Sequence, residues 1–188
     1  MEIVMNQQKR IHPHKFTLWI AIASILMMFA GLTSAFIVKS NLAGWRNIEM
    51  PQFFWYSTAT ILISSLTMQM ALRSFRQRSM DQYRWLIALT FVLGITFVAL
   101  QWLGFKSLWN QNIKFNGSAG AGQFLYVIFG LHALHVVGGV IALVAIWWKA
   151  FFGKVKIYSS VPVEVAATYW HFVDLLWIFL LVFFLVIG

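Results

Sequence analysis

Five long apolar runs, separated by short polar segments, organise this sequence of 188 residues. Each run is longer than the ~20 residues that a helix needs to cross the hydrocarbon core of a membrane, and none contains Lys or Arg. The runs are continuous, whereas strands of a membrane barrel alternate between apolar and polar residues. Backbone inside lipid must satisfy its own hydrogen bonds, which favours helices. The pattern predicts an all-α polytopic bundle of five transmembrane helices at about residues 16–38, 52–72, 85–105, 123–148 and 164–187.

Composition supports a membrane protein and excludes several other kinds of site. Hydrophobic residues make up 61% of the chain and charged residues 10%, whereas globular chains are roughly half apolar and a quarter charged. The sequence has no cysteine, which excludes disulfides, iron–sulfur clusters and thiolate metal sites. No internal repeat or soluble domain interrupts the pattern, so we expect residues 1–188 to form a single membrane domain.

The basic residues lie in the short connecting segments and predict an orientation. The formal net charge is +9, which in this setting indicates contact with anionic lipid headgroups rather than nucleic acid. Of the 14 Lys and Arg residues, ten lie in the N-terminal tail and the second and fourth connections, and four lie in the first and third. Because cytoplasmic loops carry the excess of Lys and Arg, the count places the N-terminus in the cytoplasm and the C-terminus in the periplasm of a bacterial inner membrane.

Ionisable side chains inside the apolar runs are rare, and they cluster in the last two runs. Charged groups in lipid are costly and usually mark a partner or a pathway. On the fifth helix, Glu164, His171 and Asp174 share one face, because their spacings of seven and three residues bring them into line. A rise of ~1.5 Å per residue puts His135 ~20 Å and Asp174 ~15 Å from the cytoplasmic ends of their runs. These two side chains could therefore meet if the fourth and fifth helices pack with these faces together.

Three interpretations of this cluster remain open. The first is a metal or haem site built from His132, His135 and His171, although their depths do not converge on one point. The second is a proton or ion path along a chain of acids and histidines. The third is an interhelical hydrogen-bond network that fixes the bundle or holds lipid headgroups. The third is the commonest use of such groups and is the one we favour.

The last two runs also carry motifs that resemble a known family. Residues 164–177 read E-x4-Y-W-H-F-V-D-x2-W, which resembles the signature in the last helix of cytochrome c oxidase subunit III. Residues 130–136 read G-x-H-x2-H-V, and residues 93–101 read L-G-x2-F-x2-L-Q; both are similar to segments of that family. The hydroxyl-rich second run, at residues 57–67, resembles the corresponding helix of that family. The resemblance covers all five runs in order.

The sequence also departs from that family pattern. Many members have seven helices, and this chain resembles the shorter five-helix form, which lacks the first two. A buried glutamate that many members carry in the helix matching the first run is Ile25 here. The acid often found shortly after the glutamine of the third run is Gly104 here. Proton-related roles of those acids are therefore not carried over.

The resemblance implies a non-catalytic subunit III of a haem-copper terminal oxidase, with no catalytic residue and no haem, copper or other metal on this chain. Haem and copper would lie in the partner subunits I and II, and phospholipid would lie in a cleft between the helices. The complex would reduce oxygen to water and pump protons, and an electron-donating respiratory complex is a further candidate partner. Structural or lipid-associated roles are then expected for His132, His135, Glu164, Tyr169, Trp170, His171 and Asp174.

Two further functions stay open at this stage. A homologous subunit of a quinol oxidase or a nitric-oxide-reductase system would have the same features, because the electron-donor site belongs to other subunits. An independent proton-coupled transporter is the alternative from another class. Such transporters tend to have inverted repeats and helices broken at mid-membrane, and the sequence has neither feature.

Overall fold

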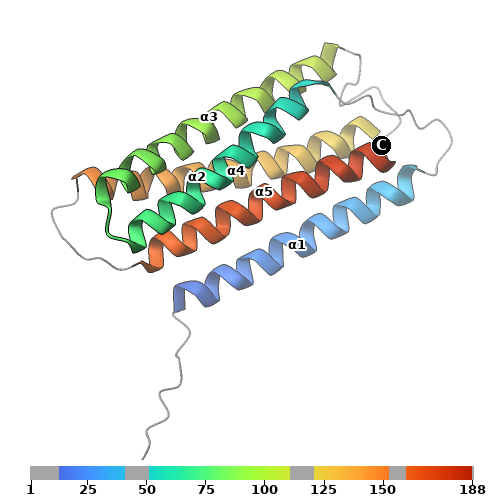
Figure 1. The fold of residues 1–188 in the computed structure, drawn as a ribbon. Helices are drawn as coiled ribbons and strands as arrows, with labels where there is room; N and C mark the ends of the chain where they lie inside the picture. Colours follow the sequence, from blue (N-terminus) through green and yellow to red (C-terminus); the bar gives the residue numbers. More distant parts are fainter. Residues whose placement is uncertain (1–12, 41–50, 111–120, 153–159, 188) are drawn as a thin grey trace, which may run out of the picture.

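The computed structural model describes residues 13–40, 51–110, 121–152 and 160–187. These residues form five helices, whose axes lie roughly along a common line (Figure 1). The all-α prediction is confirmed. The helices are α1 (Pro13–Ser40), α2 (Phe53–Arg76), α3 (Met80–Asn110), α4 (Ala121–Phe152) and α5 (Val161–Ile187).

The helices extend beyond the apolar runs at most of their ends. For example, α3 begins five residues before the third run and ends five residues after it, because helical hydrogen bonds continue through the headgroup region. Within the described residues, α1, α3, α4 and α5 are long and apolar enough to cross a membrane. Helix α2 is less apolar, since it carries six hydroxyl side chains between Ser57 and Thr67. The membrane crossing of residues 52–72 therefore stays a prediction.

A tight turn joins α2 to α3 and makes them antiparallel neighbours. The amide of Ser79 donates to the carbonyl of Ser74 at 3.0 Å, and the amide of Arg78 donates to that of Phe75 at 3.1 Å. These bonds satisfy carbonyls that the end of a helix would otherwise leave unpaired. Arg78 adopts the left-handed conformation that the turn requires, with φ 60. The turn reverses the chain direction within a few residues and aligns α3 along α2.

Helices α2 to α5 form a four-membered ring, and α1 lies outside it. Around the ring, α2 packs on α3, α3 on α4, α4 on α5, and α5 on α2. Helix α1 packs on α4 and α5 but has no packing contact with α2 in the described part of the chain (Figure 1). The side of α5 between α1 and α2 is therefore left partly uncovered.

Two glycines let α3 and α4 approach the ring of Trp170 on α5. A Cβ atom at Gly94 would lie 2.9 Å from Cη2 of Trp170, and one at Gly139 would lie 3.0 Å from Cε3. Small residues allow this close packing, which drives helix association where lipid removes the hydrophobic contribution. The Trp170 ring, only 1% exposed, fixes how three helices are rotated against one another.

The core contains an aromatic cluster around Trp177, which is fully buried. The Trp177 ring lies 5.8, 5.5 and 5.3 Å from the rings of Phe54, Phe97 and Phe129, respectively. These rings come from α2, α3 and α4, so one side chain of α5 contacts every other helix of the ring. Such aromatic pairs add to the stability provided by burial alone.

Candidate functional site

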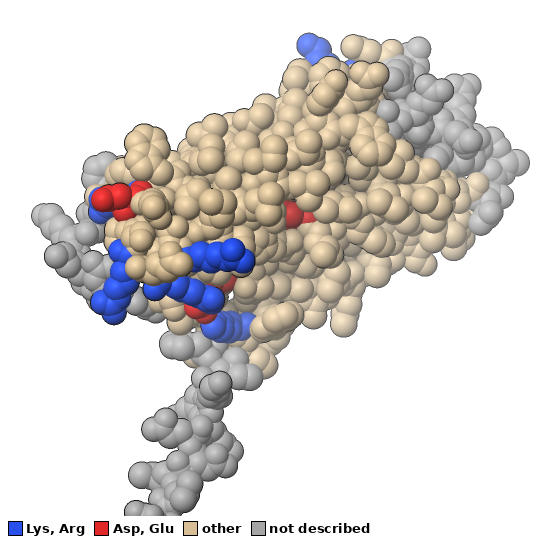
Figure 2. Space-filling model, viewed as in Figure 1, with Lys and Arg blue, Asp and Glu red and all other residues tan. Residues whose placement is uncertain are grey.

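Glu164 joins three helices at one end of the bundle. Its carboxylate accepts hydrogen bonds from Lys15 Nζ on α1 at 2.7 Å and from Arg76 Nη2 on α2 at 3.1 Å. The Glu164 side chain is 19% exposed, and those of Lys15 and Arg76 are 43% and 59% exposed. Figure 2 shows Lys and Arg side chains gathered at this end, while the middle of the visible surface carries almost none. The ion pairs thus lie where charge is tolerated beside a membrane.

His171, two helical turns after Glu164, connects α5 to α2. Its Nδ1 lies 2.7 Å from Oγ of Ser65, and its Nε2 lies 3.3 Å from Oε1 of Gln69. Because the amide oxygen of Gln69 can only accept, Nε2 is the nitrogen that donates. Both partners lie on α2. His171 therefore takes part in an interhelical network of the third kind considered above.

Two tryptophans extend this connection along α5. The indole N–H of Trp170 donates to Oγ of Ser64 at 3.1 Å, and that of Trp177 donates to Oγ1 of Thr58 at 2.9 Å. The two tryptophans are seven residues apart, so both project from the same face of α5. Hydrogen bonds to hydroxyls of α2 therefore repeat along the contact between the two helices. The sequence shows that the second run is rich in hydroxyls that can bond across helices, but not that α5 is the helix that bonds to them.

We expect Thr58→Val to destabilise the fold by about 1 kcal/mol, the scale of interhelical hydrogen bonds in membranes. Valine keeps the shape of threonine but leaves the Trp177 indole N–H without its acceptor. The measurement is thermal unfolding of the chain in mild detergent. Ser24→Ala is the control, because the Ser24 hydroxyl is exposed and bonds only to the carbonyl of Ile20 in its own helix. Equal stability of Thr58→Val and the unmodified chain would contradict the role given to this bond.

Tyr169 and His135 connect α5, α4 and α1. The Tyr169 hydroxyl donates to the backbone carbonyl of His135 at 3.0 Å. Nδ1 of His135 donates to the carbonyl of Leu131 in its own helix at 2.7 Å. The His135 ring then packs edge-on against Phe29 of α1, with ring centroids 5.9 Å apart. His135 is therefore directed toward α1.

The expected meeting of His135 with Asp174 does not occur. Both carboxyl oxygens of Asp174 are buried and lack a hydrogen-bond partner among the described residues. The ionisable face of α5 is directed toward α2 through His171 and Glu164, and not toward α4. Helix rise predicts the depth of a side chain, but close packing of the aromatic residues decides its direction around the helix axis. The condition for that pairing, that the two faces pack together, is therefore not met among the described residues.

His132 has an environment different from that of the other histidines. It is 1% exposed, and its ring lies 5.3 Å from that of Trp177 and 6.3 Å from that of Phe97. Neither ring nitrogen has a hydrogen-bond partner within the described part of the chain. His132 and Asp174 are thus the two buried ionisable side chains of this region that the helix contacts do not satisfy.

The three histidines of the fourth and fifth runs are not brought together. His132 lies in the aromatic cluster, His135 faces α1, and His171 faces α2. Among the residues that the structure describes, no group of three or more His, Asp or Glu side chains is placed to hold a metal ion. The polar groups of α5 are used mainly for contacts between helices.

A cavity of about 300 Å³ lies beside the Glu164 ion pairs. It is bounded by Lys15, Leu18 and Trp19 of α1, by Leu72 and Arg76 of α2, and by Glu164, Val165 and Thr168 of α5. The cavity lies at one end of the uncovered side of α5 described above, which we call the strip between α1 and α2. From the sequence, Lys15 and Arg76 served only to predict topology; their pairing with Glu164 depends on how the helices are arranged.

Gly104 explains one departure from the family pattern. A Cβ atom at this position would lie 2.8 Å from Cε1 and 3.0 Å from Cζ of Phe54, which is fully buried. An acidic side chain does not fit between α3 and α2 here without moving Phe54. The absence of an acid at this position therefore agrees with the packing.

The family model described as cytochrome c oxidase subunit III matches residues 11–188. The chain is 30% identical over 162 residues to the probable cytochrome c oxidase subunit 3 of Nocardia farcinica (strain IFM 10152), covering 84% of this chain and 79% of the relative. It is 27% identical over 167 residues to cytochrome c oxidase subunit 3 of Bacillus sp. (strain PS3), covering 86% and 80%. The chain therefore belongs to the cytochrome c oxidase subunit III family.

Proposed function

We propose that this chain is the non-catalytic subunit III of a haem-copper terminal oxidase in a bacterial inner membrane. The family match over residues 11–188 supports the assignment to an oxidase. The observation that supports a non-catalytic role is the use of the polar side chains of α5. His171, Trp170 and Trp177 bond to hydroxyl and amide groups of α2. Glu164 is neutralised by two cations.

In this proposal, the chain supports a catalytic subunit I and a subunit II, which hold the haem and copper. The complex reduces oxygen to water and pumps protons, and an electron-donating respiratory complex is a further partner. The N-terminus lies in the cytoplasm and the C-terminus in the periplasm. The cluster of Lys and Arg at the end of the bundle that carries Glu164 supports this orientation (Figure 2).

We further propose that the strip between α1 and α2 holds a structural phospholipid. Four side chains of α5 line the strip at helical spacing: Thr168, Leu175, Phe179 and Val182. All four are exposed, with Leu175 at 66%. A chain of methylene groups fits such an apolar floor, and α1 and α2 provide two walls that do not touch each other.

The charged end of this strip supports a lipid headgroup. Lys15 and Arg76 share the single carboxylate of Glu164, so the cavity that they line carries one net positive charge. Both cations remain substantially exposed. Lys and Arg near a membrane surface attract anionic lipid by about 1 kcal/mol each. The cavity therefore has the charge to bind a phosphate group, next to an apolar floor.

We expect Arg76→Gln to weaken the affinity of this strip for its phospholipid about fivefold, which corresponds to ~1 kcal/mol. The measurement is lipid phosphorus and mass spectrometry after purification in mild detergent. Lys149→Gln is the matched control, because Lys149 is an exposed cation in the last turn of α4 and does not line the cavity. An equal loss of lipid in both variants would contradict the proposed headgroup site.

The assignment to an oxidase is tested by affinity purification of the full chain from its own membranes. We expect haem absorbance in the optical spectrum, together with a larger polytopic subunit rich in histidine that mass spectrometry identifies. The identity of the accompanying electron-accepting subunit would also distinguish cytochrome c from quinol as donor. A colourless preparation of this chain alone, under conditions that keep other respiratory complexes intact, would contradict the assignment.

A further inference from the structure

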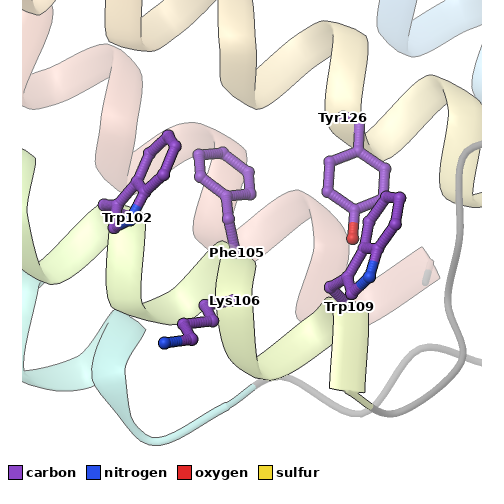
Figure 3. Close-up of a pocket in the computed structure, with 5 residues that line it drawn as sticks. All are labelled: Trp102, Phe105, Lys106, Trp109 and Tyr126. Carbon is purple, nitrogen blue, oxygen red and sulfur yellow. The ribbon is translucent and has the colours of Figure 1, made fainter.

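A second cavity lies at the end of the bundle opposite Glu164. It occupies about 390 Å³ between the last turns of α3 and the first turns of α4. Its lining comprises four aromatic residues and one lysine: Trp102, Phe105, Lys106, Trp109 and Tyr126. Figure 3 shows that α3 contributes all of these side chains except Tyr126, which comes from α4. Its volume is within the range of small-molecule sites.

The walls of this cavity suit an amphipathic ligand at a membrane surface. The ring of Phe105 packs beside that of Tyr126, with centroids 5.9 Å apart, and forms an apolar base. Trp102 and Trp109 are 73% and 53% exposed and stand at either side of these rings (Figure 3). Tryptophan and tyrosine are enriched where headgroups meet hydrocarbon, because their rings are apolar and their N–H and O–H groups are polar.

Lys106 adds a positive charge to this aromatic site. It extends from α3 away from the Phe105 and Tyr126 rings (Figure 3). Among the described residues, no carboxylate forms an ion pair with it. The three acids of the described ranges lie elsewhere: Asp81 and Glu164 in the first turns of α3 and α5, and Asp174 buried within α5. Lys15, at the other end of the bundle, differs from Lys106 because it forms an ion pair with Glu164.

We propose that this cavity is a binding site for one phospholipid with an anionic headgroup. The Lys106 ammonium group binds the phosphate, and the Phe105 and Trp102 rings, which lie further from the end of α3, contact the glycerol and the upper part of an acyl chain. Trp109 and Tyr126 lie beside the headgroup. The charge selects an anionic headgroup over a zwitterionic one, and the apolar walls select a lipid over a free anion. This site is separate from the strip between α1 and α2 and lies at the opposite end of the bundle.

The test is competitive lipid retention by the full chain in nanodiscs. The discs contain phosphatidylcholine with a minor fraction of phosphatidylglycerol, and native mass spectrometry counts the lipids that stay bound on release. We expect Lys106→Gln to weaken the affinity of this cavity for phosphatidylglycerol about fivefold, equivalent to ~1 kcal/mol for one cation, while lipid in the strip between α1 and α2 stays bound. Trp109→Ala removes one wall of the cavity and is expected to lower retention in the same direction.

Two controls make the result specific to the cavity. Lys39→Gln removes an exposed lysine of the last turn of α1, outside the cavity, and Trp85→Ala removes a tryptophan of α3 that is 79% exposed near the other end. We expect both to keep the retention of the unmodified chain. Equal losses in Lys106→Gln and Lys39→Gln, or equal retention of phosphatidylcholine and phosphatidylglycerol, would overturn the proposal. The readout requires no oxidase partner, so it is independent of the proposed function, and Arg76→Gln reports separately on the other end.

Discussion

Trp177→Ala is expected to destabilise the folded chain by about 3 kcal/mol, the lower end of the range for Trp-to-Ala changes in protein cores. Trp177 is fully buried, with a relative exposure of 0%. Its removal leaves a cavity between α2, α3 and α4, where its ring contacts Phe54, Phe97 and Phe129. Because helix association in lipid has no hydrophobic driving force, the lost van der Waals contacts are the main cause of the destabilisation. Equilibrium unfolding in mild detergent measures the change.

Two variants separate the causes of this loss. Trp177→Phe keeps an aromatic ring but removes the indole N–H that donates to Thr58, so its effect should be close to that of Thr58→Val. Trp85→Ala removes a tryptophan that is 79% exposed, and we expect stability within about 0.5 kcal/mol of the unmodified chain. If Trp177→Ala and Trp85→Ala had similar effects, the aromatic cluster would not be the centre of the core.

Gly94→Ala is expected to destabilise the chain by about 2 kcal/mol, although alanine is the better helix former. The new Cβ atom would lie 2.9 Å from Cη2 and 3.3 Å from Cζ2 of Trp170. The indole is buried and hydrogen-bonded to Ser64, so it cannot move away freely. The same unfolding measurement applies, and the hydrogen bond of Trp170 should weaken with the displacement of its ring.

Gly130→Ala is the matched control for this clash. A Cβ atom at Gly130 meets no other atom within 4 Å, so the helix preference of alanine should raise stability by up to ~1 kcal/mol. The two substitutions are chemically identical and are expected to have opposite signs. In a Trp170→Ala background, Gly94→Ala should no longer destabilise, because the atom that it clashes with is gone. A persistent loss in that background would show that the clash lies elsewhere.

The fold could be predicted largely from the lengths of the apolar runs. Backbone hydrogen bonds must be satisfied within each segment in lipid, so five such runs predict five helices, as observed. Helix α2 is the partial exception, since its hydroxyl groups reduce its apolarity. Those groups are hydrogen-bonded within the bundle, as for Ser64 with Trp170 and Ser65 with His171. A hydropathy pattern alone does not distinguish hydroxyls that face lipid from hydroxyls that face another helix.

The candidate site was predicted less completely. The spacing of Glu164, His171 and Asp174 correctly indicated one ionisable face of α5, because helix geometry within one segment is local. The sequence left open whether this face packs on the fourth helix: His171 and Glu164 bond to α2, and Glu164 also reaches Lys15 of α1. The spacing of residues along one helix does not indicate which other helices pack against it.

The sequence by itself determined the helices, the clustering of ionisable groups in the last two runs, and the resemblance to a family that the family comparison confirmed. Only the tertiary structure decided which helices touch, where α1 lies, and which polar groups pair. The physical reason is that composition and periodicity act along each helix, whereas rotation about its axis is decided by packing between distant residues. Here Trp170 against Gly94 and Gly139 decides that rotation, because only glycines let the indole approach so closely.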